Sequence, residues 1–186
     1  IVGDSYETNA VNVELTLKGT SDEVGTILLV VPLNSVYKNG KYYDFSISQC
    51  VALQILKNAC DNPMKKDLKV LFLGANSVPP QRSYGMEQFL YENSGLFVNT
   101  FAVLLDINNS FVPVTVSASK NGKPVSSVIL EKIFKCIKSN NNCAKFSTAE
   151  IVRSRFNVLS SDKALDAFLT ENTKAVLLTN NSSVDF

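Results

Sequence analysis

Short apolar runs, separated by polar turns and by segments of helical periodicity, dominate the hydrophobic pattern of the chain. Residues 11–18 alternate between apolar and polar, which predicts a strand with one face in water. Four further runs are continuously apolar and have the length of strands covered on both faces. They lie at 27–31, 70–73, 101–105 and 175–178, and a less apolar extended segment lies at 111–116.

Helices are predicted between these strands. Ser46 and Gln49 have the spacing of a capping box at the start of an apolar helix, which runs to about Cys60. Helical spacing of apolar residues continues at 84–92, 125–137 and 162–170. Short buried strands that alternate with helices predict an α/β fold, a three-layer sandwich with a mixed, mainly parallel central sheet.

Length and composition favour one compact domain. The 186 residues are 45% hydrophobic and 19% charged, which is ordinary for a globular protein, and we expect a single domain over 1–186. No apolar run approaches the roughly 20 residues that span a bilayer. Because the sequence opens at Ile1 without a methionine, we expect a mature form or a domain excised from a longer precursor.

The ionisable residues exclude several classes of function. A net charge of +1 provides no field that would recruit nucleic acid or an anionic membrane. The chain contains no histidine, the commonest metal ligand and general base near neutral pH. A three-histidine zinc site, a Ser-His-Asp triad and a Cys-His dyad are therefore excluded.

The four cysteines leave two interpretations open. Cys50 and Cys60 share a predicted helix and would lie about 15 Å apart, too far for a disulfide. Cys136 and Cys143 flank a polar turn and could be bridged. The alternative, at least as well supported, is two buried thiols and two incidental ones. Cys50 has no evident base, which favours a buried apolar role over that of a nucleophile.

Polar, mostly uncharged residues follow the predicted strands. In a parallel sheet, the functional crevice lies beyond the carboxyl ends of the strands. Here those ends carry the sequences Pro-Leu-Asn-Ser at 32–35, Gly-Ala-Asn-Ser at 74–77, Asp-Ile-Asn-Asn at 106–109 and Thr-Asn-Asn at 179–181. An active hydrolase usually keeps several ionisable groups at such positions.

Several segments, in this order, resemble those of one enzyme family. The quoted stretches are VNVELTLKG at 11–19, ILLVVPLNS at 27–35, the segment 44–56, VLFLGANS at 70–77, FAVLLD at 101–106 and the segment 161–178. Together they resemble the co-catalytic two-zinc aminopeptidases. That fold is shared by glutaminyl cyclases and by the protease-like domains of transferrin receptor and nicastrin. The resemblance implies the aminopeptidase type of three-layer sandwich, also described as phosphorylase/hydrolase-like.

The resemblance also shows that most metal-site positions have changed. Pro32 stands where the family has its first ligand histidine, and Asn34 where it has the aspartate that orients that histidine. Asn76 and Ser77 replace the paired glutamates, one a general base and one a ligand. The last ligand histidine falls near Asn181. These changes imply a degenerate member that binds no zinc and needs no cofactor.

Two carboxylates and one lysine remain at positions that the resemblance marks. Asp44 corresponds to the carboxylate that bridges the metals, Asp106 to a ligand, and Lys163 stands in place of a histidine. Two carboxylates are too few for zinc, which prefers three or four protein ligands that include nitrogen or sulfur. Asp44 and Asp106 could form a residual calcium or magnesium site. The favoured alternative is that Asp44 starts a loop or caps the following helix, and that Asp106 accepts hydrogen bonds from backbone amides at a strand end. Lys163 either fills the metal pocket or, as we favour, faces solvent.

A tyrosine-rich loop lies next to the expected pocket. Tyr37, Tyr42 and Tyr43 either form a binding surface for a partner or cover the end of the sheet, and the sequence favours neither.

We therefore predict a pseudo-peptidase, an inactive peptidase-like domain that binds an unidentified protein or peptide or acts as a scaffold. The alternatives are a hydrolase with different chemistry, which would use Asp44, Asp106 and Lys163, and a residual aminopeptidase. The resemblance implies an extracytoplasmic location, which can be periplasmic, secreted or lumenal.

Overall fold

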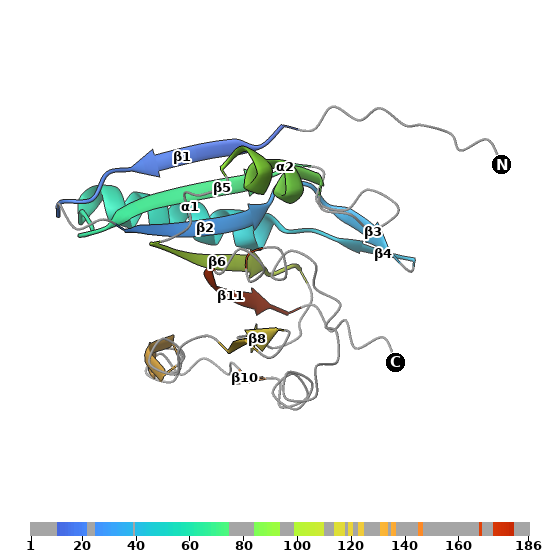
Figure 1. Ribbon diagram of the computed structural model, residues 1–186. Helices are drawn as coiled ribbons and strands as arrows, with labels where there is room; N and C mark the ends of the chain where they lie inside the picture. The colour runs from blue at the N-terminus through green and yellow to red at the C-terminus, as the bar shows by residue number, and fades with distance from the viewer. Residues whose placement is uncertain are drawn as a thin grey trace.

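A seven-stranded sheet forms the centre of the fold in the computed structural model (Figure 1). The structure describes residues 11–21, 25–38, 40–74, 84–93, 99–109, 114–117, 119–120, 123–124, 131–133, 135–136, 145–146, 168 and 173–180. The sheet strands are β1 (Val13–Leu17), β2 (Thr26–Pro32), β5 (Asp67–Leu73), β6 (Thr100–Asp106), β7 (Thr115–Ser117), β10 (Lys145–Phe146) and β11 (Lys174–Thr179). Their order is β1-β5-β2-β6-β11-β7-β10.

The four central strands of the sheet are parallel to one another. β2 pairs with β5 on one side and with β6 on the other, and β6 pairs with β11, each time in parallel. β1 is antiparallel to β5, and β7 is antiparallel to β11. The prediction of a mixed, mainly parallel sheet is thus confirmed. The continuous apolar runs form its centre because those strands are buried on both faces.

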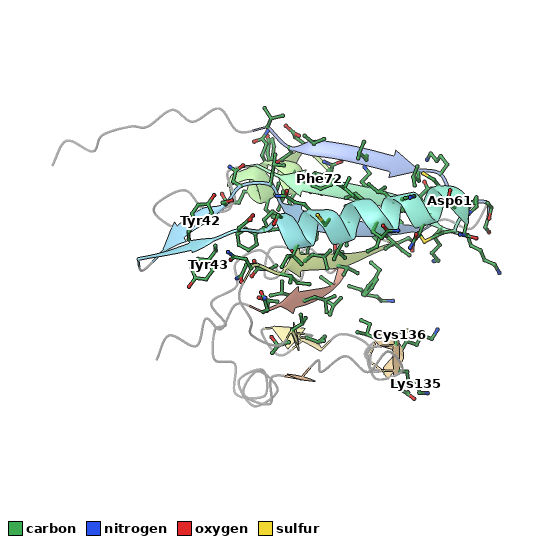
Figure 2. All side chains as sticks on the ribbon, turned by 180° about the vertical axis from the view of Figure 1, so that it is seen from behind. Tyr42, Tyr43, Asp61, Phe72, Lys135 and Cys136 are labelled. Atoms are coloured by element: carbon green, nitrogen blue, oxygen red, sulfur yellow. The ribbon has the colours of Figure 1, made fainter. Side chains whose placement is uncertain are left out.

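The two faces of the sheet carry separate hydrophobic clusters. Helix α2 (Tyr84–Glu92) covers one face, and helix α1 (Ser46–Asp61) covers the other (Figures 1 and 2). The α2 cluster comprises Leu28, Val30, Leu71, Leu73, Met86, Phe89, Ala102, Leu104, Phe168, Ala175 and Leu177. The α1 cluster comprises Leu29, Val31, Ala52, Leu56, Leu68, Val70, Phe72 and Leu105. Consecutive residues of each strand alternate between the clusters, as the period of a strand requires. Within the described residues, no helix is long and apolar enough to cross a membrane.

Most predicted elements are present, with shifted ends. The helix at 84–92 is found with the predicted bounds, whereas β5 begins at Asp67, three residues before the apolar run. The apolar pattern did not indicate this part of the strand because Asp67 and Lys69 are charged. Lys69 forms an ion pair with Glu14 of the neighbouring strand β1, and Asp67 forms one with Lys18, which directly follows β1. Of the predicted helices at 125–137 and 162–170, the described residues 131–133, 135–136 and 168 are helical, and the other residues lie outside the described part.

The predicted capping box at the start of α1 is wrong. Phe45 is the N-cap residue, and no side chain caps the helix from that position. Ser46 instead lies in the first turn, where its backbone N–H donates to Asp44 Oδ1 at 2.9 Å. The Gln49 amide donates to the carbonyl oxygens of Pro32 and Leu33, at the end of β2. Tertiary contacts to β2 thus replaced the local pairing of Ser46 with Gln49.

The prediction that Cys50 on α1 is buried is also wrong. Cys50 and Cys60 are exposed and form no disulfide. The helix buries Ser48, Ala52 and Leu56, which repeat every four residues and therefore share one face. Cys50 and Cys60 lie off this stripe. Cys136 is exposed, and Cys143 lies outside the described residues.

Helix α2 approaches the sheet closely because glycine lies at the contact. A Cβ atom on Gly85 would lie 2.7 Å from Asn12 Oδ1 and would overlap the carbonyl oxygen of Gly74. Asn12 holds this junction together, since its amide donates to the Gly85 carbonyl and its Oδ1 accepts from the Gly74 N–H. One side chain before β1 thus joins α2 to the end of β5.

Two charged residues fix the far end of β1. The Asp67 carboxylate accepts from the Gly19 backbone N–H and from Lys18 Nζ, both at 2.8 Å. The Gly19 N–H, and after it Lys18, lower the pKa of Asp67. A carboxyl group with a lowered pKa stabilises the folded state above its unfolded-state pKa of about 3.9, and this contribution is lost as the pH falls through the folded-state pKa.

We expect Asp67→Asn to lower stability at neutral pH and to have little effect at a pH below the folded-state pKa. Urea denaturation of both proteins at the two pH values measures this. A stability difference that is equal at both would show that the charge of Asp67 is not responsible.

Candidate functional site

The carboxyl ends of four strands meet at one edge of the sheet. Because β5, β2, β6 and β11 are parallel, the segments that follow them lie at the same end. This edge is where the sequence predicted a crevice. Within the described residues it carries Leu33, Asn34, Gly74, Ile107, Asn108, Asn109 and Asn180.

Amide and hydroxyl groups join the ends of β6 and β11. Thr179 Oγ1 donates to Asp106 Oδ2 at 3.0 Å. The Asn180 side chain accepts from the Asn108 N–H at 2.8 Å and donates to the Asn108 carbonyl at 2.9 Å. Asn108 is fully buried, and Asn180 is 4% exposed. The Asn180 amide satisfies backbone groups that water does not reach, so it holds the two strand ends together.

The Asp44 carboxylate lies at the start of helix α1. It accepts from the backbone N–H of Ser46 at 2.9 Å and from Ser46 Oγ at 3.0 Å. A carboxylate at a helix N-terminus is favoured by the helix dipole. The backbone of Asp44 also exchanges hydrogen bonds with Asn109, whose N–H donates to the Asp44 carbonyl at 3.0 Å and whose Oδ1 accepts from the Asp44 N–H at 3.3 Å. Asp44 thus adjoins the segment that follows Asp106.

Two polar residues in the first turn of α1 form hydrogen bonds to the segments that follow the strands. The sequence did not predict this role for either residue. Ser48 is fully buried, and its hydroxyl donates to the Ile107 carbonyl at 2.9 Å and accepts from the Ile107 N–H at 2.8 Å. Gln49 reaches the end of β2. Ser48 is a small polar residue on the apolar face of a helix, which in the sequence indicates a buried hydrogen bond. The sequence did not indicate that the partner is the backbone of Ile107.

The structure places half of the predicted metal-site residues. Pro32 is the buried last residue of β2, Asn34 is exposed, and Asp44 and Asp106 are half-buried. Asn76, Ser77, Lys163 and Asn181 lie outside the described residues.

A β-hairpin projects beyond this edge of the sheet (Figure 1). Strands β3 (Val36–Lys38) and β4 (Lys41–Tyr43) pair in an antiparallel two-stranded sheet, in which Tyr37 lies opposite Tyr42. Gly40 lies in the connecting turn with a φ of 75°, a conformation that glycine adopts without strain. Tyr42 is 62% exposed, whereas Tyr43 is half-buried (Figure 2). Tyr42 therefore presents an aromatic ring to solvent next to the strand ends.

Among the residues that the structure describes, none form a group that fits a zinc site. The sequence supplies no histidine, and the described ranges contain no group of three or more Cys, Asp or Glu residues that could hold a metal ion. Asp44 and Asp106 both accept hydrogen bonds from neighbouring hydroxyl groups. Zinc requires three or four protein ligands, usually with nitrogen or sulfur among them.

Solved structures with this fold are zinc aminopeptidases and related enzymes. A zinc aminopeptidase from Bacillus subtilis is similar with a TM-score of 0.64 and 11% identity over 94% of this chain and 41% of its own. A glutaminyl cyclase from Bacteroides thetaiotaomicron has a TM-score of 0.61 and 13% identity, over 95% of this chain and 66% of its own. A peptidase precursor from Shewanella amazonensis has a TM-score of 0.57 and 14% identity, over 91% of this chain and 35% of its own. No protein-family model and no curated protein sequence match the chain.

The class of fold is therefore that of the zinc aminopeptidases, as the sequence predicted. At these identities the likeness shows the fold and leaves the activity open. The chain spans about two fifths of the length of the Bacillus subtilis enzyme.

We expect Asn180→Ala to lower the free energy of unfolding by about 2 kcal/mol, because it leaves the buried N–H and carbonyl of Asn108 without the Asn180 amide. Chemical denaturation measures the loss. Asn58→Ala is the control, since Asn58 is exposed on α1 and forms a side-chain hydrogen bond at the surface. Equal effects of the two substitutions would contradict a structural role for the Asn180 amide.

Proposed function

We propose that the chain is a catalytically inactive, peptidase-like domain of a longer protein, and that it acts by binding a protein or peptide. The observation that carries this proposal is a zinc aminopeptidase-like fold in a chain that contains no histidine. The metal-dependent hydrolysis that this fold supports elsewhere needs ligands that this sequence does not supply.

The hydrogen bonds at the strand ends support the proposal. Asp44 and Asp106, the carboxylates that correspond to metal ligands by resemblance, interact with Ser46 and Thr179. The Asn180 side-chain amide pairs with the backbone N–H and carbonyl of Asn108 in a buried position. Uncharged groups in this position avoid the repulsion between buried carboxylates that loss of a metal would leave. The positions of the family's paired glutamates hold Asn76 and Ser77, neither of which accepts a proton from water at neutral pH.

We expect the purified protein to retain no stoichiometric zinc after dialysis against the metal, and to cleave no aminoacyl substrate. Elemental analysis and an aminopeptidase assay measure the two properties, with the Bacillus subtilis zinc aminopeptidase as the positive control in both. One or two equivalents of tightly bound zinc, together with cleavage, would contradict the proposal.

The tyrosine hairpin is the proposed recognition surface. It projects beyond the strand ends, and Tyr42 exposes most of its ring there. Tyrosine provides a large apolar contact area with a polar end and loses little conformational entropy on binding, which is why it is frequent at interfaces. The proposal includes an extracytoplasmic location, which agrees with the likeness to a peptidase described as a precursor.

We expect Tyr42→Ser to weaken binding of peptides selected against the folded domain by at least about tenfold, as loss of a central aromatic contact does. Selection from a peptide library, followed by titration of the enriched peptides, provides the measurement. Tyr91→Ser is the matched control, because Tyr91 is 81% exposed on α2, on a different element. If both variants bind the peptides as the parent does, the hairpin is not the recognition surface.

A further inference from the structure

Strand β1 is an edge strand of the seven-stranded sheet. Within the described residues its one partner is β5, so its outer edge presents backbone N–H and carbonyl groups that no strand pairs with (Figure 1). Such an edge is a template for another strand, and proteins usually protect it with proline, a bulge or charged residues. The residues 13–17 of β1 contain no proline and pair with β5 in an unbroken register.

One face of β1 is apolar and partly uncovered. Val13 and Leu15 are 42% and 43% exposed, and Leu17 packs against the α1 cluster. These side chains lie on the α1 side of the sheet, since they stand opposite Phe72, Val70 and Leu68 of that cluster. The apolar surface on this side therefore continues to the open edge.

On the other face, β1 and the residue that follows it carry charges that form ion pairs with β5. Glu14 pairs with Lys69 at 2.8 Å, and Lys18 pairs with Asp67 at 2.8 Å. Charged side chains that interact with the strand behind them do not shield the edge. The Lys18 side chain nevertheless remains 83% exposed and can interact with a further carboxylate.

We propose that two copies of this chain pair through β1, antiparallel and around a twofold axis at Thr16, to form one continuous sheet. In this register Glu14 of each copy faces Lys18 of the other, Leu15 faces Leu17, and Thr16 faces Thr16. The pairing follows from the sequence VELTLKG at 13–19, which places opposite charges at equal distances on either side of Thr16.

Charge complementarity selects this register and a second copy as the occupant. An axis at Glu14 would place Glu14 against itself, and an axis at Lys18 would place Lys18 against itself; like charges directly opposite destabilise a strand pair. An axis at Leu15 would leave Glu14 opposite Thr16 and form no charge pair. With the axis at Thr16, each end of the interface carries the row Lys69, Glu14, Lys18, Asp67, in which the charges alternate in sign.

The same register extends the hydrophobic core across the interface. Leu15 and Leu17 from both copies meet on the α1 side, where Val13 is partly exposed as well. A net charge of +1 per chain leaves little general repulsion between copies. One strand pair buries less area than a standard stable interface, so the dimer is weak and reversible.

Sedimentation equilibrium over a concentration series tests the pairing. We expect a monomer–dimer equilibrium, which Glu14→Lys or Lys18→Glu each weakens by about tenfold, because each places like charges opposite one another at both ends of the interface. The double variant Glu14→Lys, Lys18→Glu restores the dimer, since the facing charges are again opposite. The double variant still lacks the intrachain ion pairs with Lys69 and Asp67. If it dimerises like the parent, the single variants were weakened by like charges at the interface and not by loss of those intrachain pairs. Glu87→Lys, an exposed change on α2, is the control for net charge.

A cross-link gives an independent readout of the axis. We expect Thr16→Cys to form a disulfide between two copies, because residues on the axis face each other at the distance of a strand pair. Thr20→Cys is the control, since Thr20 lies off the axis, and mass spectrometry of the linked peptide distinguishes position 16 from the native cysteines. A protein that is monomeric at every concentration overturns the proposal, even if its edge binds another protein. The proposal is also wrong if the protein dimerises but neither Glu14→Lys nor Lys18→Glu weakens the dimer and Thr16→Cys forms no disulfide between copies.

Discussion

The parallel pairing of β5, β2, β6 and β11 is the constraint on which the rest of the structure depends. These strands are buried on both faces between α1 and α2, so their backbone groups must pair with each other and their side chains must divide between two hydrophobic clusters. Parallel pairing also brings the residues after each strand to one edge. The segment after β6, at residue 108, and the segment after β11, at residue 180, are 72 residues apart in the chain and become neighbours for that reason.

Hydrogen bonds from neutral groups hold this edge together. Ser48 binds the segment after β6, Gln49 binds the end of β2, and Asn180 binds the backbone of Asn108. In a metal enzyme, ligands from several strand ends are held together by the ion that they share. Here hydrogen bonds from amide and hydroxyl groups hold the strand ends together. These groups are uncharged, so their burial requires no metal ion to neutralise them. These hydrogen bonds fix the shape of the strand ends, and the exposed hairpin beside them is the surface proposed to contact a partner.

The edge strand β1 is less buried than the central strands of the sheet. β1 is covered on one side, so its apolar residues remain partly exposed and its charged residues interact along the surface with β5. The alternating pattern of β1 indicated a strand at the boundary of the sheet. Exposure of the apolar face was not visible in that pattern, because it depends on how far α1 extends over β1.

Local patterns allowed β1, the four central strands, the helix at 84–92 and the mixed, mainly parallel sheet to be predicted from the sequence, because apolar periodicity is fixed by the geometry of each element. The hairpin of β3 and β4 was predicted only as a loop. The absence of histidine was equally visible, and it limits the chemistry whatever the fold. The failures share a cause. Gln49 had the spacing of a local cap but reaches β2, Cys50 lies on an apolar helix but off its buried stripe, and Asp67 is charged but belongs to a strand. In each case a contact between residues far apart in the sequence decided the outcome. The sequence by itself determined the central strands of the sheet and the absence of histidine; the tertiary structure alone decided which side chains meet at the strand ends, because those contacts arise only when the strands pair.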